Sequence, residues 1–132
     1  MHHASAVGLA ALLSLVACGV ASADPCTAKL PSAGAIVQGE VRYIGDGDSL
    51  CIGRTADPGE WVEIRLADFN APELNESGGR EAKAALASLV MGRQAICRVE
   101  HHSYDRAVAM CSVDGRSIGD QMRRYGVAEG GR

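Results

Sequence analysis

A single helical stripe divides the strand-like runs of this chain into two groups, and that order restricts the fold more than any other feature. Small and aliphatic residues recur at helical spacing, which predicts an amphipathic helix over Arg80–Met91 that ends at Gly92. Runs rich in β-branched residues or alternating in polarity lie on both sides of it. Three strands are expected before the helix and two after it: Ile36–Ile44, Ser49–Gly53, Trp61–Ala67, Ala95–Glu100 and Ala107–Val113.

A second, shorter helix is expected further along the chain. Ser117 and Asp120 form a capping-box pattern for Ile118–Tyr125, and Gly126 ends this segment. Five short strands with a helix between the third and the fourth are typical of a small Greek-key barrel of the OB type. We therefore predict an α+β, mainly β domain over residues 36–132, a five-stranded OB-type barrel with a short C-terminal helix.

The first 23 residues differ in composition from the rest. Residues 4–23 carry no charged side chain, and Ala21-Ser22-Ala23 is a small-x-small pattern directly before Asp24. This predicts a secretory signal peptide over 1–23, cleaved after Ala23, and thus a secreted or periplasmic protein with an N-terminal extension at 24–35. Leu15-Val16-Ala17-Cys18 resembles a bacterial lipobox, so a lipoprotein anchored at Cys18 is the alternative.

Four cysteines follow the predicted leader: Cys26, Cys51, Cys97 and Cys111. An even number in an exported domain favours two disulfides. Cys97 and Cys111 are equidistant from Tyr104, so a hairpin centred on that residue places them opposite each other. The expected pairs are Cys97–Cys111 and Cys26–Cys51, and four buried thiols are the alternative.

Polar residues gather where a purely structural core would not need them. Asp46-Gly47-Asp48 follows the first strand and can either hold a hard cation or form a simple turn. Arg65 lies within a strand and needs an anionic partner, for which Glu63 and Glu73 are candidates. With Arg106 at the hairpin, these groups could bind a metal, hold a phosphate and activate a water molecule, which phosphodiester hydrolysis requires.

Four segments in Val41–Ala128 resemble, in order, the staphylococcal nuclease-like (thermonuclease) domain family. They are Ile44–Ser49, Arg65–Glu73, Tyr104–Arg106 and Gly115–Ala128. Their combination is far more specific than any one of them. The resemblance implies an OB-type barrel and an exported, calcium-dependent nuclease that hydrolyses phosphodiester bonds of DNA and RNA.

The resemblance also implies catalytic roles for three residues. Arg65 matches the family arginine that contacts the scissile phosphate, and Arg106 matches the second catalytic arginine. Glu73 matches the carboxylate proposed as general base. Asp105 takes the place of a glycine beside the second arginine, so an acidic side chain stands next to a catalytic position.

Three further residues match the calcium ligands of the family. Asp48 matches the first carboxylate ligand, and Ala71 occupies the position that offers its backbone carbonyl. Asn70 stands where the family has its second carboxylate. An amide oxygen can still bind Ca²⁺, but the exchange removes one negative charge from the site.

The net charge of −3 excludes a protein that holds nucleic acid through its overall charge. Any phosphate affinity must come from a local arginine and metal site. A non-catalytic, nuclease-like OB module that binds nucleic acid or another anionic ligand, in association with the cell envelope or free, is therefore the alternative function. We expect a monomer with nucleic acid as substrate and no stable protein partner, and membrane contact only through a lipid at Cys18.

Overall fold

The computed structural model describes residues 3, 8, 10–11 and 24–130. Cleavage after Ala23 and lipidation at Cys18 fall outside the described residues. Among those residues, no helix combines the length and the hydropathy that crossing a bilayer requires.

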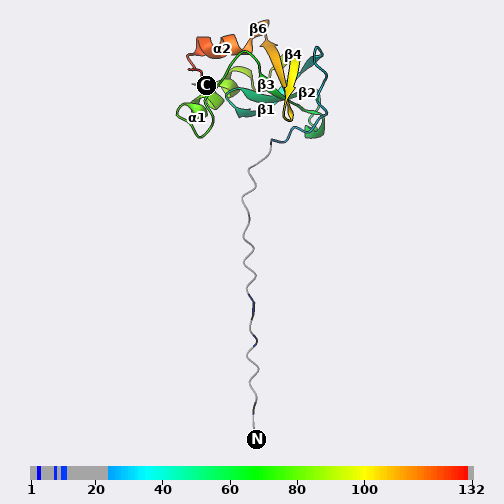
Figure 1. Ribbon diagram of the computed structural model, residues 1–132, viewed down its shortest axis with the longest axis vertical. Helices are drawn as coiled ribbons and strands as arrows, with labels where there is room; N and C mark the ends of the chain where they lie inside the picture. The colour runs from blue at the N-terminus through cyan, green and yellow to red at the C-terminus, as the bar shows by residue number, and fades with distance from the viewer. Residues whose placement is uncertain (1–2, 4–7, 9, 12–23, 131–132) are drawn as a thin grey trace.

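The described chain is mainly β, with one helix after the third strand and a second helix near the C-terminal end (Figure 1), as predicted. Six strands, rather than the expected five, are present in the described residues. The additional strand has two residues and pairs with its predecessor across a turn at Asp114 and Gly115, both of which have a positive φ. The elements are β1 (Ile36–Asp46), β2 (Ser49–Gly53), a 3-10 turn (Pro58–Glu60), β3 (Val62–Leu66), α1 (Gly79–Val90), β4 (Gln94–Ser103), β5 (Arg106–Val113), β6 (Arg116–Ser117) and α2 (Ile118–Tyr125).

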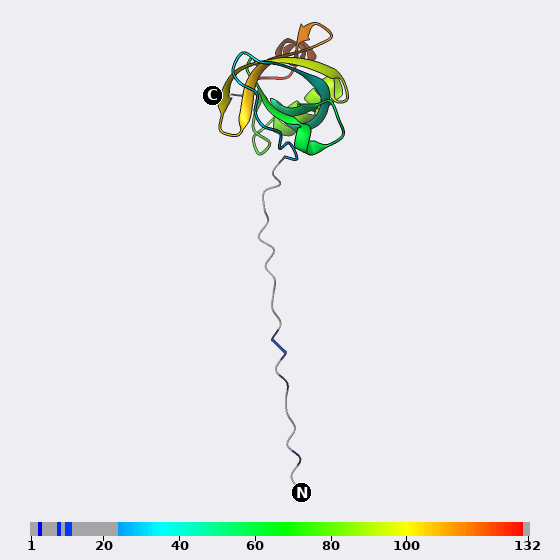
Figure 2. The same cartoon turned by 90° about the vertical axis from the view of Figure 1, so that its right-hand side faces the viewer.

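The sheet closes on itself. Its strand order is β3-β2-β1-β4-β5-β6, and β3 also pairs with β5. That closing pair is parallel, with Arg65 opposite Val108, whereas the other pairs are antiparallel. Strands β1 to β5 therefore form a ring (Figure 2), and β6 extends the sheet outside it.

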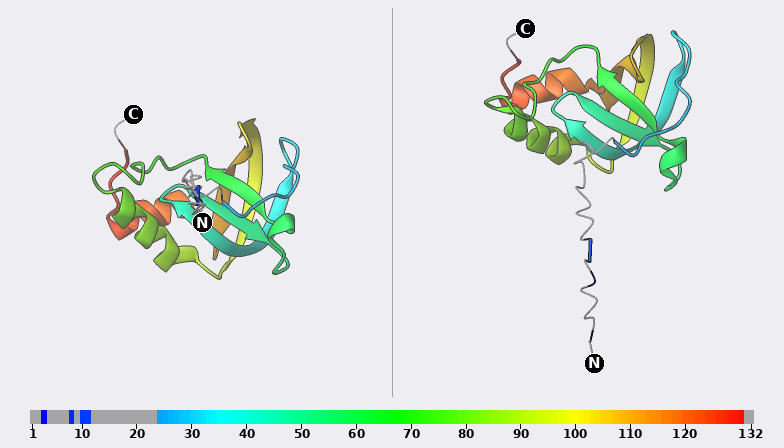
Figure 3. Two further views of the ribbon diagram at one scale, coloured as in Figure 1. Left: turned by 90° about the horizontal axis from the view of Figure 1, so that it is seen from below. Right: turned by 60° about the horizontal axis from the view of Figure 1, so that its bottom comes forward.

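Alternation along the strands separates a core face from an outer face. Val62, Ile64 and Leu66 of β3 are buried, while Glu63 and Arg65 point outward. Helix α1 contributes the fully buried Leu86 to the core. Both helices lie together at one end of the sheet (Figure 3).

Two disulfides are present in residues 24–130, and they join the pairs expected from the sequence. Cys97 and Cys111 are direct partners on β4 and β5, with Cα atoms 4.0 Å apart. The hairpin turn is Tyr104-Asp105, which lies half a residue beyond the predicted centre, and an irregularity at Glu100 restores the register at the cysteines.

The N-terminal extension is fixed to the outside of the ring. Cys26 is disulfide-bonded to Cys51 of β2, with Cα atoms 6.1 Å apart. The Thr27 N–H donates to the carbonyl of Pro58, and the Ala28 N–H donates to that of Trp61. The extension thereby reaches the outer face of β2 and β3, because Cys51 is the cross-strand neighbour of Glu63.

Candidate functional site

The turn between β1 and β2 is held by its first carboxylate. Asp46 Oδ1 accepts hydrogen bonds from the Asp48 N–H at 3.0 Å and from the Ser49 hydroxyl at 2.8 Å. A Cβ on Gly47 would lie 2.6 Å from the Cβ atoms of Ala71 and Ala82, so only glycine lets the turn pack against α1. This close approach directs the Asp48 side chain into the protein.

Asp48 is a buried carboxylate, with 6% of the residue exposed. Its Oδ2 accepts a hydrogen bond from the Ala71 N–H at 2.9 Å and lies 3.2 Å from Arg65 Nη2. Burial raises the pKa of Asp48 to about 6, and the hydrogen bond and charge of Asp46 add to this rise. The Ala71 N–H and the Arg65 charge oppose it.

Arg65 is bonded to the chain through both terminal nitrogens of its guanidinium. Nη1 donates to the carbonyls of Leu66 and Phe69, the latter at 2.8 Å. Nη2 donates to Asn70 Oδ1 at 2.8 Å and contacts Asp48. Arg65 therefore pairs with the carboxylate of Asp48, whereas the sequence had suggested Glu63 and Glu73 as candidates. Asp48 is within reach because the next residue, Ser49 of β2, lies opposite Arg65.

Arg106 begins β5 and lies on the same outer face as Arg65, because β3 and β5 run parallel in this part of the ring. It stands beside Glu63, a residue that sequence reasoning gave no functional role. Burial raises the pKa of Glu63 to about 8, helped by the hydrogen bond that its protonated form donates to Asp24 and by the charges of Asp24 and Asp105. The positive charge of Arg106 opposes that rise.

The oxygens that Asn70 and Ala71 would offer to an ion beside Asp48 already have neighbours in the protein. Asn70 Oδ1 accepts from Arg65 Nη2 at 2.8 Å. A Cβ on Gly130 would lie 3.1 Å from the Ala71 carbonyl oxygen, so the C-terminal segment lies against that carbonyl. The three predicted calcium ligands are close in space. Arg65 contacts an oxygen of Asp48 and the side-chain oxygen of Asn70, and the C-terminal segment lies against the Ala71 carbonyl.

Comparison with known proteins assigns the chain to a family. A family model described as staphylococcal nuclease homologue matches residues 63–130, slightly more than half of the chain. The chain belongs to this family. The matched range includes Arg65, Glu73 and Arg106, the three residues for which the family resemblance implies catalytic roles.

One curated relative of this nuclease homologue is Protein ParB of Escherichia coli. The two are 36% identical over 70 residues, which are 53% of this chain and 37% of the relative. The aligned region thus spans well under half of that protein.

Glu73, the predicted general base of this nuclease homologue, lies in the exposed loop between β3 and α1. Its N–H donates to Glu76 Oε1 at 3.1 Å. A Cβ on Gly79 would overlap the Glu73 carbonyl, so the loop returns tightly onto the first residue of α1. The structure thus fixes the backbone of Glu73 in an exposed part of the loop.

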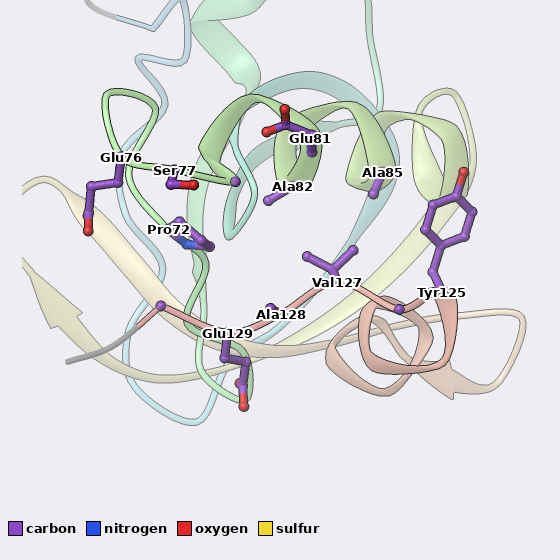
Figure 4. A pocket seen from close by; sticks show the side chains of 13 residues that line it. Pro72, Glu76, Ser77, Glu81, Ala82, Ala85, Tyr125, Val127, Ala128 and Glu129 are labelled. Carbon is purple, nitrogen blue, oxygen red and sulfur yellow. The ribbon is translucent and has the colours of Figure 1, made fainter.

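A cavity of about 480 Å³ lies between α1 and the segment that follows α2 (Figure 4). Its floor is apolar, with Ala82, Ala85 and Val127, and Tyr125 stands at one end. The charged residues among those that line it are Glu76, Glu81 and Glu129, all acidic. Such a lining repels phosphate, so the outer face of β3 and β5 remains the better candidate for a nucleic-acid backbone.

Sequence reasoning missed the part that the C-terminal segment plays in this nuclease homologue. Glu129 Oε1 accepts from the Asn70 N–H at 3.3 Å, and the Gly130 N–H donates to the Asn70 carbonyl at 2.6 Å. No local sequence pattern predicts such contacts, because the partners are about sixty residues apart in the chain. In the sequence itself, the acidic Glu129 and the neighbouring Gly130 are the residues that could have indicated this contact.

Proposed function

We propose that this staphylococcal nuclease homologue binds nucleic acid on the outer face of β3 and β5 and hydrolyses its phosphodiester bonds. We further infer that its closed sheet is the five-stranded OB-type barrel of the prediction, over residues 36–132. The observation that carries the function is the presence of Arg65 and Arg106 on one face of two paired strands. Two guanidinium groups on one face can contact a single phosphodiester.

The proposed mechanism assigns the charge chemistry to the arginines. Arg65 is already oriented by Asp48 and by the carbonyl of Phe69, so it can meet a phosphate with little loss of side-chain freedom. Arg106 approaches the phosphate from the β5 side and stabilises the negative charge that develops on its oxygens. Glu73 takes the proton of the attacking water, for which its exposed loop gives access. The water oxygen bonds to phosphorus as the ester P–O bond breaks, and the leaving oxygen takes a proton from solvent.

A role for calcium is suggested only by the family to which the chain belongs. The resemblance implies Ca²⁺ bound by Asp48, Asn70 and the Ala71 carbonyl. The described residues do not fit that role together, because Arg65 takes the Asn70 oxygen and Gly130 lies against the Ala71 carbonyl. No step of the mechanism above is therefore assigned to the ion, and calcium becomes a variable of the test.

Export also belongs to the proposal. Two disulfides within residues 24–130 are compatible with an oxidising compartment outside the cytoplasm. We propose a secreted or periplasmic protein with residues 1–23 as its signal peptide, the lipid-anchored form at Cys18 being the alternative. A monomer with nucleic acid as its substrate, and no stable protein partner, completes the proposal.

A second candidate function is a non-catalytic module that binds nucleic acid. The engaged Asn70 oxygen favours it, since a calcium-dependent nuclease needs that ligand position open. Binding through the two arginines would persist in such a module, and hydrolysis would be lost.

The experiment uses the full chain with a fluorescent single-stranded DNA, in the presence of Ca²⁺ or of a chelator. Glu73→Gln should lower the cleavage rate by about 10²-fold or more, the usual contribution of a general base, and leave DNA affinity nearly unchanged. Arg106→Ala should weaken binding about tenfold, as expected for a lost charge-assisted contact. Arg54→Ala, an exposed arginine at the end of β2 away from this face, is the matched control.

The outcomes separate the candidates. Cleavage that Glu73→Gln and Arg106→Ala leave unchanged contradicts the assigned roles. DNA that is bound but stays intact under every ionic condition selects the non-catalytic module, and absence of binding excludes both.

A further inference from the structure

Asn70 has all four of its hydrogen-bonding groups engaged. Its N–H donates to Glu129 Oε1 at 3.3 Å, and its carbonyl accepts from the Gly130 N–H at 2.6 Å. In the side chain, Oδ1 accepts from Arg65 Nη2 at 2.8 Å, and Nδ2 donates to the Gly130 carbonyl at 3.4 Å. One amide side chain thus connects the phosphate-binding arginine to the segment Val127–Gly130, which we call the C-terminal clamp.

The clamp is itself attached to the rest of the fold. The Val127 N–H donates to the carbonyl of Met122, a fully buried residue of α2. Glu129 also contacts Arg123, whose Nη1 donates to the Asp68 carbonyl at 2.8 Å and whose guanidinium lies 5.9 Å from the Phe69 ring centre. Helix α2 therefore holds the clamp against the loop that carries Asn70.

Only an amide satisfies both ends of this connection. Arg65 needs an acceptor and the Gly130 carbonyl needs a donor. An aspartate at position 70 could accept from Arg65 but would place a carboxylate against the Gly130 carbonyl and near Glu129. Arg65 Nη2 lies 2.8 Å from Asn70 Oδ1 and 3.2 Å from Asp48 Oδ2. A cation bound by both of these oxygens would have to displace the guanidinium.

We propose that Asn70 is a positioning residue that joins Arg65 to the C-terminal clamp. The Arg65 guanidinium then occupies the position between Asp48 and Asn70 that a divalent cation would otherwise take. Phosphate binding at Arg65 then needs no calcium. This inference rests on the proposed function, because it takes Arg65 as a phosphate ligand. It departs from the calcium-binding role that the resemblance implied for Asn70.

The first test is the affinity of the unmodified full chain for single-stranded DNA, in chelator and in Ca²⁺. Equal affinity within about twofold is expected, since the arginine is positioned without the ion. Binding that appears only after Ca²⁺ is added would overturn the proposal, and this measurement needs no variant.

The second test is Asn70→Asp, with Asn75→Asp as matched control. Asn75 is exposed in the same loop, so the control makes the same change of charge without touching Arg65 or the clamp. Asn70→Asp should weaken DNA binding in chelator by about tenfold, because a carboxylate neutralises Arg65 and loses the bond to Gly130. It should also gain a Ca²⁺-binding signal in calorimetry that the unmodified chain lacks. Unchanged affinity in chelator, or calcium binding by the unmodified chain at this position, contradicts the inference.

The third test separates this inference from the proposed function and uses no DNA. Acceptors on both Nη atoms should restrict rotation of the Arg65 guanidinium, so its Nη signals should be resolved in NMR spectra of the unmodified chain. In Asn70→Ala, Nη2 keeps only its contact with Asp48, so the guanidinium should rotate measurably faster. If the chain fails to bind DNA while this signature is present, the proposed function fails and the positioning role stands. Averaged signals in the unmodified chain, or identical ones in a folded Asn70→Ala, overturn the positioning role.

Discussion

Two carboxyl groups on the site face retain their protons to higher pH than free carboxyls do. Burial is the main cause in both, and it raises the pKa of Asp48 to about 6 and that of Glu63 to about 8. Each has a neighbouring arginine that opposes the shift and a neighbouring aspartate that reinforces it. At neutral pH Asp48 is mostly ionised and Glu63 mostly protonated. The outer face of β3 is consequently less negative than its count of acidic residues indicates, which favours an anionic ligand.

These shifts predict how stability depends on pH. A carboxyl with a higher pKa in the folded protein than in the unfolded chain binds more protons when folded, so the free energy of unfolding falls as pH rises between the two values. For Asp48 that window runs from 3.8 to about 6, and for Glu63 from 4.5 to about 8. Above a pH of about 6.5 the slope from this pair therefore belongs to Glu63.

Glu63→Gln should make the melting temperature fall less between a pH of about 6.5 and about 8.5 than it does in the unmodified chain. Calorimetry or circular dichroism across this range measures the difference. Glu100→Gln makes the same change of charge on an exposed part of β4 and should follow the unmodified chain. Parallel curves for all three proteins would show that Glu63 ionises normally.

At the scale of elements, residues at both ends of helix α2 fix where it begins and where it stops. The Ser117 hydroxyl accepts from the Asp120 N–H at 3.0 Å, and Gly126 ends the helix with φ +94°. Arg123 in its last turn then reaches the carbonyl of Asp68 beside the site. The cap therefore supports the loop that carries Asn70 as well as the helix.

Ser117→Ala should lower the free energy of unfolding by about 1 kcal/mol, the typical effect of losing an N-cap. Urea unfolding with an unchanged denaturant slope is the measurement. Ser117→Asn keeps a capping oxygen and should recover most of the loss. Equal midpoints for the alanine and asparagine variants would contradict a capping role.

Elements with local signals could be predicted from the sequence, and α2 has the predicted bounds because its cap and its final glycine are adjacent to it. The ends of the strands were less accurate, since pairing extended β1 to Asp46 and β4 to Ser103. The parallel pair of β3 and β5 and the contacts of Asn70 could not be predicted. Both join residues far apart in the chain, and no periodicity within either segment encodes its partner.

At the scale of the whole molecule, the two disulfides within residues 24–130 cross-link different parts of the fold. Cys97–Cys111 lies within the core between neighbouring strands, and Cys26–Cys51 fixes the extension outside the ring. Their sequence separations are 14 and 25 residues. Constraint of the unfolded chain predicts about 3 kcal/mol from each, slightly more for the longer loop.

Replacing both cysteines of one pair should therefore lower the free energy of unfolding by about 3 kcal/mol, and replacing all four should match the reduced unmodified chain. Guanidinium unfolding with and without reductant gives both quantities. Removing Cys26–Cys51 should leave the core packing intact, whereas removing Cys97–Cys111 also empties space beside Val99 and Ala109. A variant as stable as the oxidised chain would contradict the corresponding cross-link.

The parallel pairing of β3 with β5 also determines when the candidate site comes into existence during folding. Antiparallel neighbours such as β1 and β2 are joined by short turns and can pair early, but β3 and β5 are separated by α1 and β4. Their contact carries the larger loop-closure entropy and is expected late. Arg65 and Arg106 lie on these two strands, so a partly folded chain with an open ring lacks the proposed phosphate-binding face.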